Sequence, residues 1–200
     1  MVRQRKLQPL LLRNMLISQA MSETPAIFAF VIAILLLTKG DESLSNGASL
    51  SLAFSFIGAG LSVGLGALGA GVGCGLVGSD ALESMGRSPQ SQVRVFPWML
   101  ISQAWAQTAS AFALVISLLL IVFGGGSATP FAAADIVASA KYLGMGLCMG
   151  MGAIGPALGI SYIGGRLCRA MADTPEHFPT LRNTFIVGAA VSESTAVYSL

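Results

Sequence analysis

The sequence predicts an all-α membrane protein made of tandem transmembrane helical hairpins. Charged residues make up 10% of the chain and hydrophobic residues 54%, whereas charged residues are about 25% of ordinary soluble domains. The apolar residues also gather in repeated segments that are long enough to cross a bilayer. The 200 residues could form one soluble domain, but they lack the polar side chains that would cover its surface.

Five apolar segments, separated by polar connectors, predict about five helices in this chain. They cover residues 10–37, 50–82, 95–123, 132–171 and 180–200, and about 20 residues in a helix span the hydrocarbon core. The first segment is too long for a cleavable signal peptide. The last ends soon after Glu193, so we expect the natural protein to be longer at the C-terminus. Arg3-Gln4 at the start is typical of what remains of a turn.

Basic residues gather at one set of connectors. They are Arg3, Arg5, Lys6 and Arg13 at the start, Arg87 and Arg94 after the second segment, and Arg166, Arg169 and Arg182 around the last connector. The positive-inside rule therefore places the N-terminus and these two connectors on the cytoplasmic side. The net charge of +2 gives no reason to expect a nucleic-acid partner.

The segments repeat, and the repeating unit is a two-helix hairpin. Leu-Ile-Ser-Gln-Ala at 16–20 recurs 84 positions later at 100–104, and Ala-Leu-Gly-Ala at 67–70 is matched 86 positions later by Ala-Ile-Gly-Pro. The chain therefore divides into the second helix of one hairpin (1–38), a complete hairpin (48–124) and a third hairpin, truncated at its end (131–200). Such a direct repeat gives every copy the same orientation, unlike the inverted repeats of many secondary transporters.

The first helix of each hairpin is rich in glycine, at residues 58–78 and 144–165. Glycine disfavours a helix in water by about 1 kcal/mol relative to alanine, but a backbone in lipid has little alternative to a helix. Small residues let helices approach closely, so we expect these helices to form the inner wall of a closed ring. A phosphate-binding glycine loop would need a βαβ unit, which a membrane-length apolar segment does not provide.

One polar residue lies inside the second helix of each copy: Glu23, Gln107 and Glu193. A charge in mid-membrane costs roughly 3 kcal/mol, so a carboxyl group there predicts a functional site. Hydrocarbon favours the neutral carboxyl and water favours the ion, so a glutamate that moves between two access paths can carry a proton. The hydroxyls that could stabilise the held proton or ion belong to Ser22, Thr24, Ser192, Ser194 and Tyr198.

Gln107 differs from the two glutamates because an amide cannot ionise. We interpret it as a degenerate ion site that has lost its carrying role or is kept for packing. For the glutamates, the alternative is a structural role in hydrogen bonding between helices. Cys74, Cys148 and Cys168 lie in or near apolar segments without metal-ligand spacing, so we expect no metal site and interpret them as small buried hydrophobes.

These residues resemble the proteolipid, or c-type ring subunit, of rotary F-type ATP synthases. The resemblance covers nearly the whole chain and rests on the glycine-rich helix, the turn Arg87-Ser88-Pro89-Gln90 and the segment 193–200 with its glutamate. It implies a non-catalytic, ion-translocating subunit of a homo-oligomeric ring in membrane lipid, expected in a bacterial plasma membrane. In that ring the glycine-rich helices lie inside and the carboxylate helices outside.

The resemblance also implies partners and site residues. A stator subunit would present an arginine to the carboxylates, and central-stalk subunits would contact the turn at Arg87, Ser88, Pro89 and Gln90. The ion-binding residues would be Glu23, Thr24, Glu193, Ser194 and Tyr198. No cofactor is expected beyond the carried ion.

The chain departs from the family pattern in three places. The ordinary subunit is a single hairpin, the middle copy here has Gln107 in place of a carboxylate, and the last turn reads Asp173-Thr174-Pro175 instead of Arg-Gln-Pro. The last departure puts stalk contact by that copy in doubt. Fused hairpins that lack one carboxylate resemble vacuolar-type proteolipids, which would carry fewer ions per turn.

The expected ion is a proton in preference to sodium. Sodium-type members of the family carry a glutamine on the first helix, where this chain has Cys74 and Ile160, and neither is a hard oxygen ligand. Two other functions stay open. A self-contained channel or transporter would need broken helices or an inverted repeat, and a structural oligomer would tolerate loss of both glutamates. An enzyme would need a nucleophile–base pair or a metal cluster, and the sequence offers neither.

Overall fold

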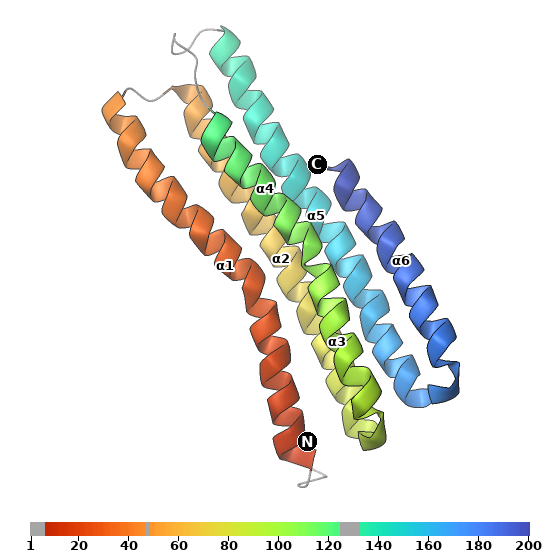
Figure 1. Ribbon diagram of the computed structural model, residues 1–200. Coiled ribbons are helices and arrows are strands. Elements are labelled where there is room, and N and C mark those ends of the chain that lie inside the picture. Colours follow the sequence, from red (N-terminus) through yellow and green to blue (C-terminus); the bar gives the residue numbers. More distant parts are fainter. Residues whose placement is uncertain (1–6, 47–48, 125–132) are drawn as a thin grey trace.

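The computed structural model describes residues 7–46, 49–124 and 133–200, which are helical apart from short turns (Figure 1). The α-helices are α1 (Gln8–Asn46), α2 (Leu50–Arg87), α3 (Gln92–Ala106), α4 (Thr108–Phe123), α5 (Ala133–Asp173) and α6 (Phe178–Tyr198). Two 3₁₀ helices, η2 (Pro89–Ser91) and η3 (Pro175–His177), follow α2 and α5. The predicted all-α fold is confirmed. Arg3-Gln4 and positions 125–130 of the third connector lie outside the described residues.

The helices form two layers. The glycine-rich helices α2 and α5 lie side by side, and α3 and α4 pack against both of them. On the two flanks, α1 packs on α2 and α6 packs on α5 (Figure 1). The start of α1, η2 and η3 all lie at one end of the bundle, called here the turn end (Figure 1). This arrangement follows from the direct repeat, since all copies have the same orientation.

Four stretches are long and apolar enough to cross a membrane: Gln8–Asp41, Leu50–Arg87, Pro89–Phe123 and Ala133–Asp173. The third stretch combines α3 and α4. The expected fifth helix is present as α6, but it does not meet the same criterion. Its 21 residues include Thr180, Arg182 and Asn183 near the start and the polar run 192–195 near the end, and these polar residues lower its mean hydropathy. The chain is therefore an integral, multi-pass membrane protein.

Glycines bring the backbones of α2 and α5 together. A Cβ atom added to Gly58 would lie 2.6 Å from the carbonyl oxygen of Tyr142, and one added to Gly69 would lie 2.8 Å from the Cα of Ile154. No ordinary side chain fits at such distances. The close packing predicted for the glycine-rich helices is thus present at this junction.

We expect Gly69→Ala to destabilise the α2–α5 pair by about 1–3 kcal/mol, the usual cost of overpacking a close contact. The new methyl group would meet the backbone of Ile154, which cannot move aside as a flexible side chain would. Thermal unfolding in detergent measures the change. Gly40→Ala is the matched control, because a Cβ atom there meets nothing within 4 Å. Equal destabilisation by the two variants would contradict this account.

The two turns at the turn end share one backbone conformation despite different sequences. Ser88 (φ −131°, ψ 87°) and Thr174 (φ −132°, ψ 73°) occupy equivalent positions, and each precedes a 3₁₀ helix that starts with proline. The Ser88 N–H donates to the Ser84 carbonyl at 2.9 Å, and the Thr174 N–H donates to the Ala170 carbonyl at 2.8 Å. The departure at 173–175 therefore changes the charge of the turn and leaves its shape intact.

Candidate functional site

The three matched polar positions all belong to the outer layer. Glu23 lies on α1, Gln107 between α3 and α4, and Glu193 on α6. Because α1 and α6 flank α3–α4 on opposite sides (Figure 1), the two glutamates are not brought together. The contacts of each position are therefore described separately.

Glu193 is held by a tryptophan of the neighbouring hairpin. The indole N–H of Trp105, on α3, donates to Oε2 of the half-buried Glu193 at 2.7 Å. The indole ring is fixed in turn by an edge-to-face contact with Phe185 of α6, with centroids 5.8 Å apart and planes at 85°. An indole nitrogen only donates hydrogen bonds, so the contact requires the glutamate oxygen to accept.

Gln107 makes the corresponding contact between α1 and α3–α4. Its Nε2 donates to the carbonyl oxygen of Met21 at 2.8 Å and approaches Cys74 Sγ at 3.6 Å. The helix is interrupted at this residue, where the Gln107 N–H turns to the Ala104 carbonyl at 3.3 Å. Gln107 thus lies at a hydrogen-bonded kink in the middle helix.

The two contacts have the same register in the repeat. Met21 and Trp105 are 84 positions apart, and each stands two positions before the mid-helix polar residue of its own copy. The side chains of Gln107 and Glu193 therefore contact residues at the same repeat position, each in the preceding copy. Sequence reasoning missed Trp105, because the equivalent positions hold Met21 and Val191 and the repeat gives no sign of an N–H donor there.

A buried glutamine of α3, Gln103, forms hydrogen bonds with both α1 and α2. Gln103 Nε2 donates to Ser18 Oγ on α1 at 2.7 Å and to the Cys74 carbonyl on α2 at 2.9 Å. Cys74 and Ile160, the two first-helix positions compared with sodium-type family members, are both buried. Among the residues that the structure describes, no group of His, Cys, Asp or Glu side chains could hold a metal ion.

The remaining predicted site residues lie apart from these contacts. Glu23 is exposed and Thr24 half-buried on α1. The Ser194 hydroxyl donates to the Val191 carbonyl of its own helix at 2.7 Å. Tyr198 is 85% exposed and, within the described part of the chain, forms no hydrogen bond with Glu193. The structure therefore assembles Glu193 with Trp105 and does not bring Tyr198 to that carboxyl group.

We expect Trp105→Phe to speed carbodiimide labelling of Glu193 several-fold. Phenylalanine keeps the ring against Phe185 but removes the N–H, and a typical hydrogen bond contributes about 0.5–1.5 kcal/mol. Carbodiimides react at a carboxyl oxygen, and the variant leaves Oε2 of Glu193 without the N–H that occupies it. Peptide mass spectrometry measures the rate, with Glu23 in the same molecules as the control. An unchanged ratio of the two rates would contradict the assignment of Trp105.

Comparison with known proteins gives the family. The sequence model of the family of ATP synthase C subunits matches residues 2–36, 57–120 and 143–200. The ATP synthase c subunit of Thermotoga petrophila is 50% identical over 60 residues, which are 30% of this chain and 71% of that protein. That of Petrotoga mobilis is 47% identical over 60 residues, 30% of this chain and 62% of that protein. The chloroplastic c subunit of the Euglena gracilis ATP synthase is 38% identical over 65 residues, 32% of this chain and 80% of that protein.

The curated relatives each align to about one hairpin, whereas the family pattern extends over most of this chain. Its three matched stretches end with the carboxylate or amide helix of each copy, around Glu23, Gln107 and Glu193. The repeat found in the sequence is therefore the repeat of a known ring component. The chain belongs to the family of ATP synthase C subunits, in a multiplied form that carries the family pattern three times.

Proposed function

We propose that this chain is an ion-translocating subunit of the rotor ring of a membrane rotary ATP synthase or ATPase, without catalytic activity of its own. Glu23 and Glu193 each carry one ion, and Gln107 carries none. The ring turns against a stator subunit whose arginine faces each carboxylate in turn and favours its ionised form. A bacterial plasma membrane is the expected location.

The proposal is supported above all by the shared register of the Gln107–Met21 and Glu193–Trp105 contacts. The same position of the repeat makes both contacts. Its side chain is an ionisable glutamate in the contact with Trp105 and a non-ionisable glutamine in the contact with Met21. A structural role alone would be served equally well by an amide at both. A carrier role requires a carboxyl group, and this chain has one at two of the three matched positions.

The carried ion is proposed to be a proton. The side-chain partner of Glu193 is an indole N–H, which donates and cannot coordinate a cation. A sodium site needs several oxygen ligands, whereas the equivalent first-helix positions hold Cys74 and Ile160. Carrying a proton requires only the carboxyl group and a route by which the proton can be released.

The turn end is the proposed contact surface for the central stalk. A hollow of about 510 Å³ lies between the two turns, and Ser88, Gln90, Arg94 and Pro175 are among the residues that line it. The two turns share a backbone conformation and so present equivalent shapes. They differ in charge, since Arg87 and Gln90 in one correspond to Asp173 and Glu176 in the other.

The proposal is tested with the complete complex in inverted membrane vesicles. ATP is expected to drive proton uptake, and a carbodiimide is expected to stop it in step with its reaction at Glu193. Sodium ions at neutral pH should leave the rate of that reaction unchanged. Protection of Glu193 by sodium would reverse the assignment of the ion. Full proton uptake after complete labelling would favour a structural role.

A further inference from the structure

The backbone carbonyl two positions before the mid-helix polar residue is bonded within its own helix in two of the three copies. In the middle copy, the Thr108 hydroxyl donates to the Trp105 carbonyl at 2.8 Å. In the last copy, the Ser194 hydroxyl donates to the Val191 carbonyl at 2.7 Å. In both copies the donor is the residue that directly follows the polar position, so a neighbouring helix finds this carbonyl already engaged.

The first copy leaves the same carbonyl open. A helical carbonyl normally accepts from the N–H four residues later, and the residue four after Met21 is Pro25, which has no N–H. In the part of the chain that the structure describes, the Thr24 hydroxyl does not bond to the Met21 carbonyl either. The equivalents of Pro25 in the other two copies are Ala109 and Thr195. Only the first copy therefore opens its carbonyl in this way.

Gln107 fills this open acceptor. Its Nε2 donates to the Met21 carbonyl oxygen at 2.8 Å, where the middle copy packs on α1. The direction of the hydrogen bond is opposite at the other contact, where Glu193 accepts from the Trp105 indole N–H. The preceding copy thus offers an acceptor to the amide and a donor to the carboxyl group.

The Met21 carbonyl sets a chemical condition on the side chain that faces it. An amide N–H or the O–H of a protonated carboxyl group can donate to it, whereas a carboxylate only accepts. A carboxylate at position 107 would therefore set two acceptors against each other and leave the carbonyl without a donor. The Cys74 thiol supplies no donor in its place, because it donates to the Gln103 carbonyl at 3.5 Å. The position suits only a side chain that keeps a hydrogen to donate.

We propose that Pro25 is a positioning residue for the middle copy, and that Gln107 acts there as a permanent substitute for a protonated carboxyl group. Pro25 opens the Met21 carbonyl, and the amide binds it with a hydrogen that it cannot release. The middle copy therefore stays neutral and hydrogen-bonded whether it faces lipid or the stator. The inference rests on the proposed function and deepens it, because it explains how a copy without a carrier passes the stator without exposing a charge.

A double-mutant cycle tests the contact. Gln107→Leu removes the donor at similar size and is expected to lower the unfolding temperature of the detergent-extracted protein by several degrees. Pro25→Ala supplies an N–H to the Met21 carbonyl, so in that background Gln107→Leu should lower the temperature by roughly half as much or less. Pro97→Ala, the same change at an exposed residue of α3, is the matched control and should leave the effect of Gln107→Leu unchanged. Equal effects of Gln107→Leu with and without Pro25→Ala would overturn the role of Pro25.

Gln107→Glu separates the hydrogen bond from simple packing. The new carboxyl group can donate to the Met21 carbonyl only while protonated, so this variant should unfold near the wild-type temperature at low pH. As the pH rises, its unfolding temperature should approach that of Gln107→Leu. The ionisable groups of the neighbouring helices, Cys74 on α2, Glu23 on α1 and Glu193 on α6, are common to all these proteins and cancel in the comparison. If Gln107→Glu were as unstable as Gln107→Leu at low pH, the proposal would be wrong.

These measurements keep the contact and the carrier role apart. The carrier role is tested by carbodiimide labelling of Glu193 in step with the loss of ATP-driven proton uptake, which does not depend on Gln107. The unfolding temperatures test the bond to the Met21 carbonyl and do not depend on ion flow. The contact can therefore fail while the carrier role stands, and the carrier role can fail while the contact stands.

Discussion

Glu193→Gln is expected to reduce ATP-driven proton uptake to background, and Glu23→Gln to do the same. Glutamine cannot take up or release a proton in this range. Because Gln107 already carries no ion, either substitution leaves two successive copies without a carboxyl group that can carry one. The ring would have to turn through that gap without an ion passing to the stator arginine. A loss of tenfold or more corresponds to a barrier raised by at least about 1.4 kcal/mol.

The matched control is Asp41→Asn, the same change of a carboxylate to an amide at an exposed residue of α1, far from the turn end. It should leave proton uptake near the wild-type rate. Assembly is checked by the size of the detergent-extracted oligomer, which all three variants should retain. If Glu23→Gln and Glu193→Gln pumped as well as Asp41→Asn, the two glutamates would be structural and the carrier role would be wrong.

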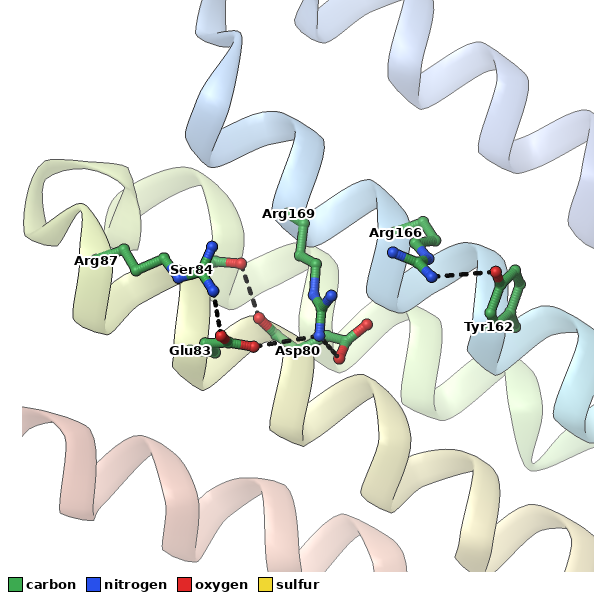
Figure 2. Close-up of polar contacts among 7 residues, drawn as sticks. All are labelled: Asp80, Glu83, Ser84, Arg87, Tyr162, Arg166 and Arg169. Carbon is green, nitrogen blue, oxygen red and sulfur yellow. Dashed lines mark hydrogen bonds and ion pairs between the residues drawn. The ribbon is translucent and has the colours of Figure 1, made fainter.

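Arg169→Glu is expected to destabilise the hairpin pair by about 2 kcal/mol or more, because it would gather three carboxylates at the α2–α5 junction. Arg169 Nη2 lies 2.6 Å from Asp80 Oδ1 and 3.2 Å from Glu83 Oε2 (Figure 2). The Arg169 and Asp80 side chains are 38% and 23% exposed, so water screens them only in part. Removing one partner of a fully buried pair costs about 3–5 kcal/mol, and an exposed pair contributes about 0–1 kcal/mol. The loss for the half-buried Arg169–Asp80 pair is expected to lie between these two values. Unfolding in detergent measures the loss.

The double variant Asp80→Arg/Arg169→Asp is expected to recover part of that stability. Exchanging the two residues restores an opposite-charge pair across the junction, and coupled contacts of this kind have interaction energies of about 0.5–3 kcal/mol. Asp80→Arg and Arg169→Asp alone give the two single arms of the cycle. A double variant as unstable as the sum of its singles would show that the ion pair contributes nothing to the α2–α5 junction.

The hairpins were predictable because the repeat and the polar connectors mark them. The turn at Arg87-Ser88-Pro89 was recognisable from its polar residues and from its resemblance to the Arg-Gln-Pro loop of the family. Its counterpart at Asp173-Thr174-Pro175 looked like a departure, yet Thr174 adopts the same backbone conformation as Ser88. Proline and the shared helix ends determine the shape of the turn, and its charged residues do not.

Tyr198 lies apart from Glu193 within one chain, and the spacing along α6 explains why. Five residues after Glu193, at 3.6 residues per turn, the tyrosine is rotated by about 140° from the glutamate. It therefore lies on another face of α6, where it is 85% exposed. Trp105, by contrast, lies on a different helix, and its meeting with Glu193 depends on how α3 packs against α6 through Phe185.

The interruption of the helix at Gln107 could not be predicted from the sequence either. The residues around it, Trp105 to Ala109, include no glycine or proline, so local propensity predicts a continuous helix. The amide instead donates to the Met21 carbonyl on a neighbouring helix. Likewise, the equivalent positions Asp80 and Arg166 carry opposite charges in the sequence. Only the packing of α2 against α5 shows that Asp80 pairs with Arg169.

The central claim is that each chain has two carriers and one silent copy. It is tested most directly by saturating the membrane-embedded protein with a carbodiimide and counting adducts by intact mass. We expect two adducts per chain, located by peptide mapping at Glu23 and Glu193, and none near Gln107. A chain that stays unlabelled within the membrane, or that reacts only at the turn-end carboxylates Asp80 and Glu83, would contradict the account.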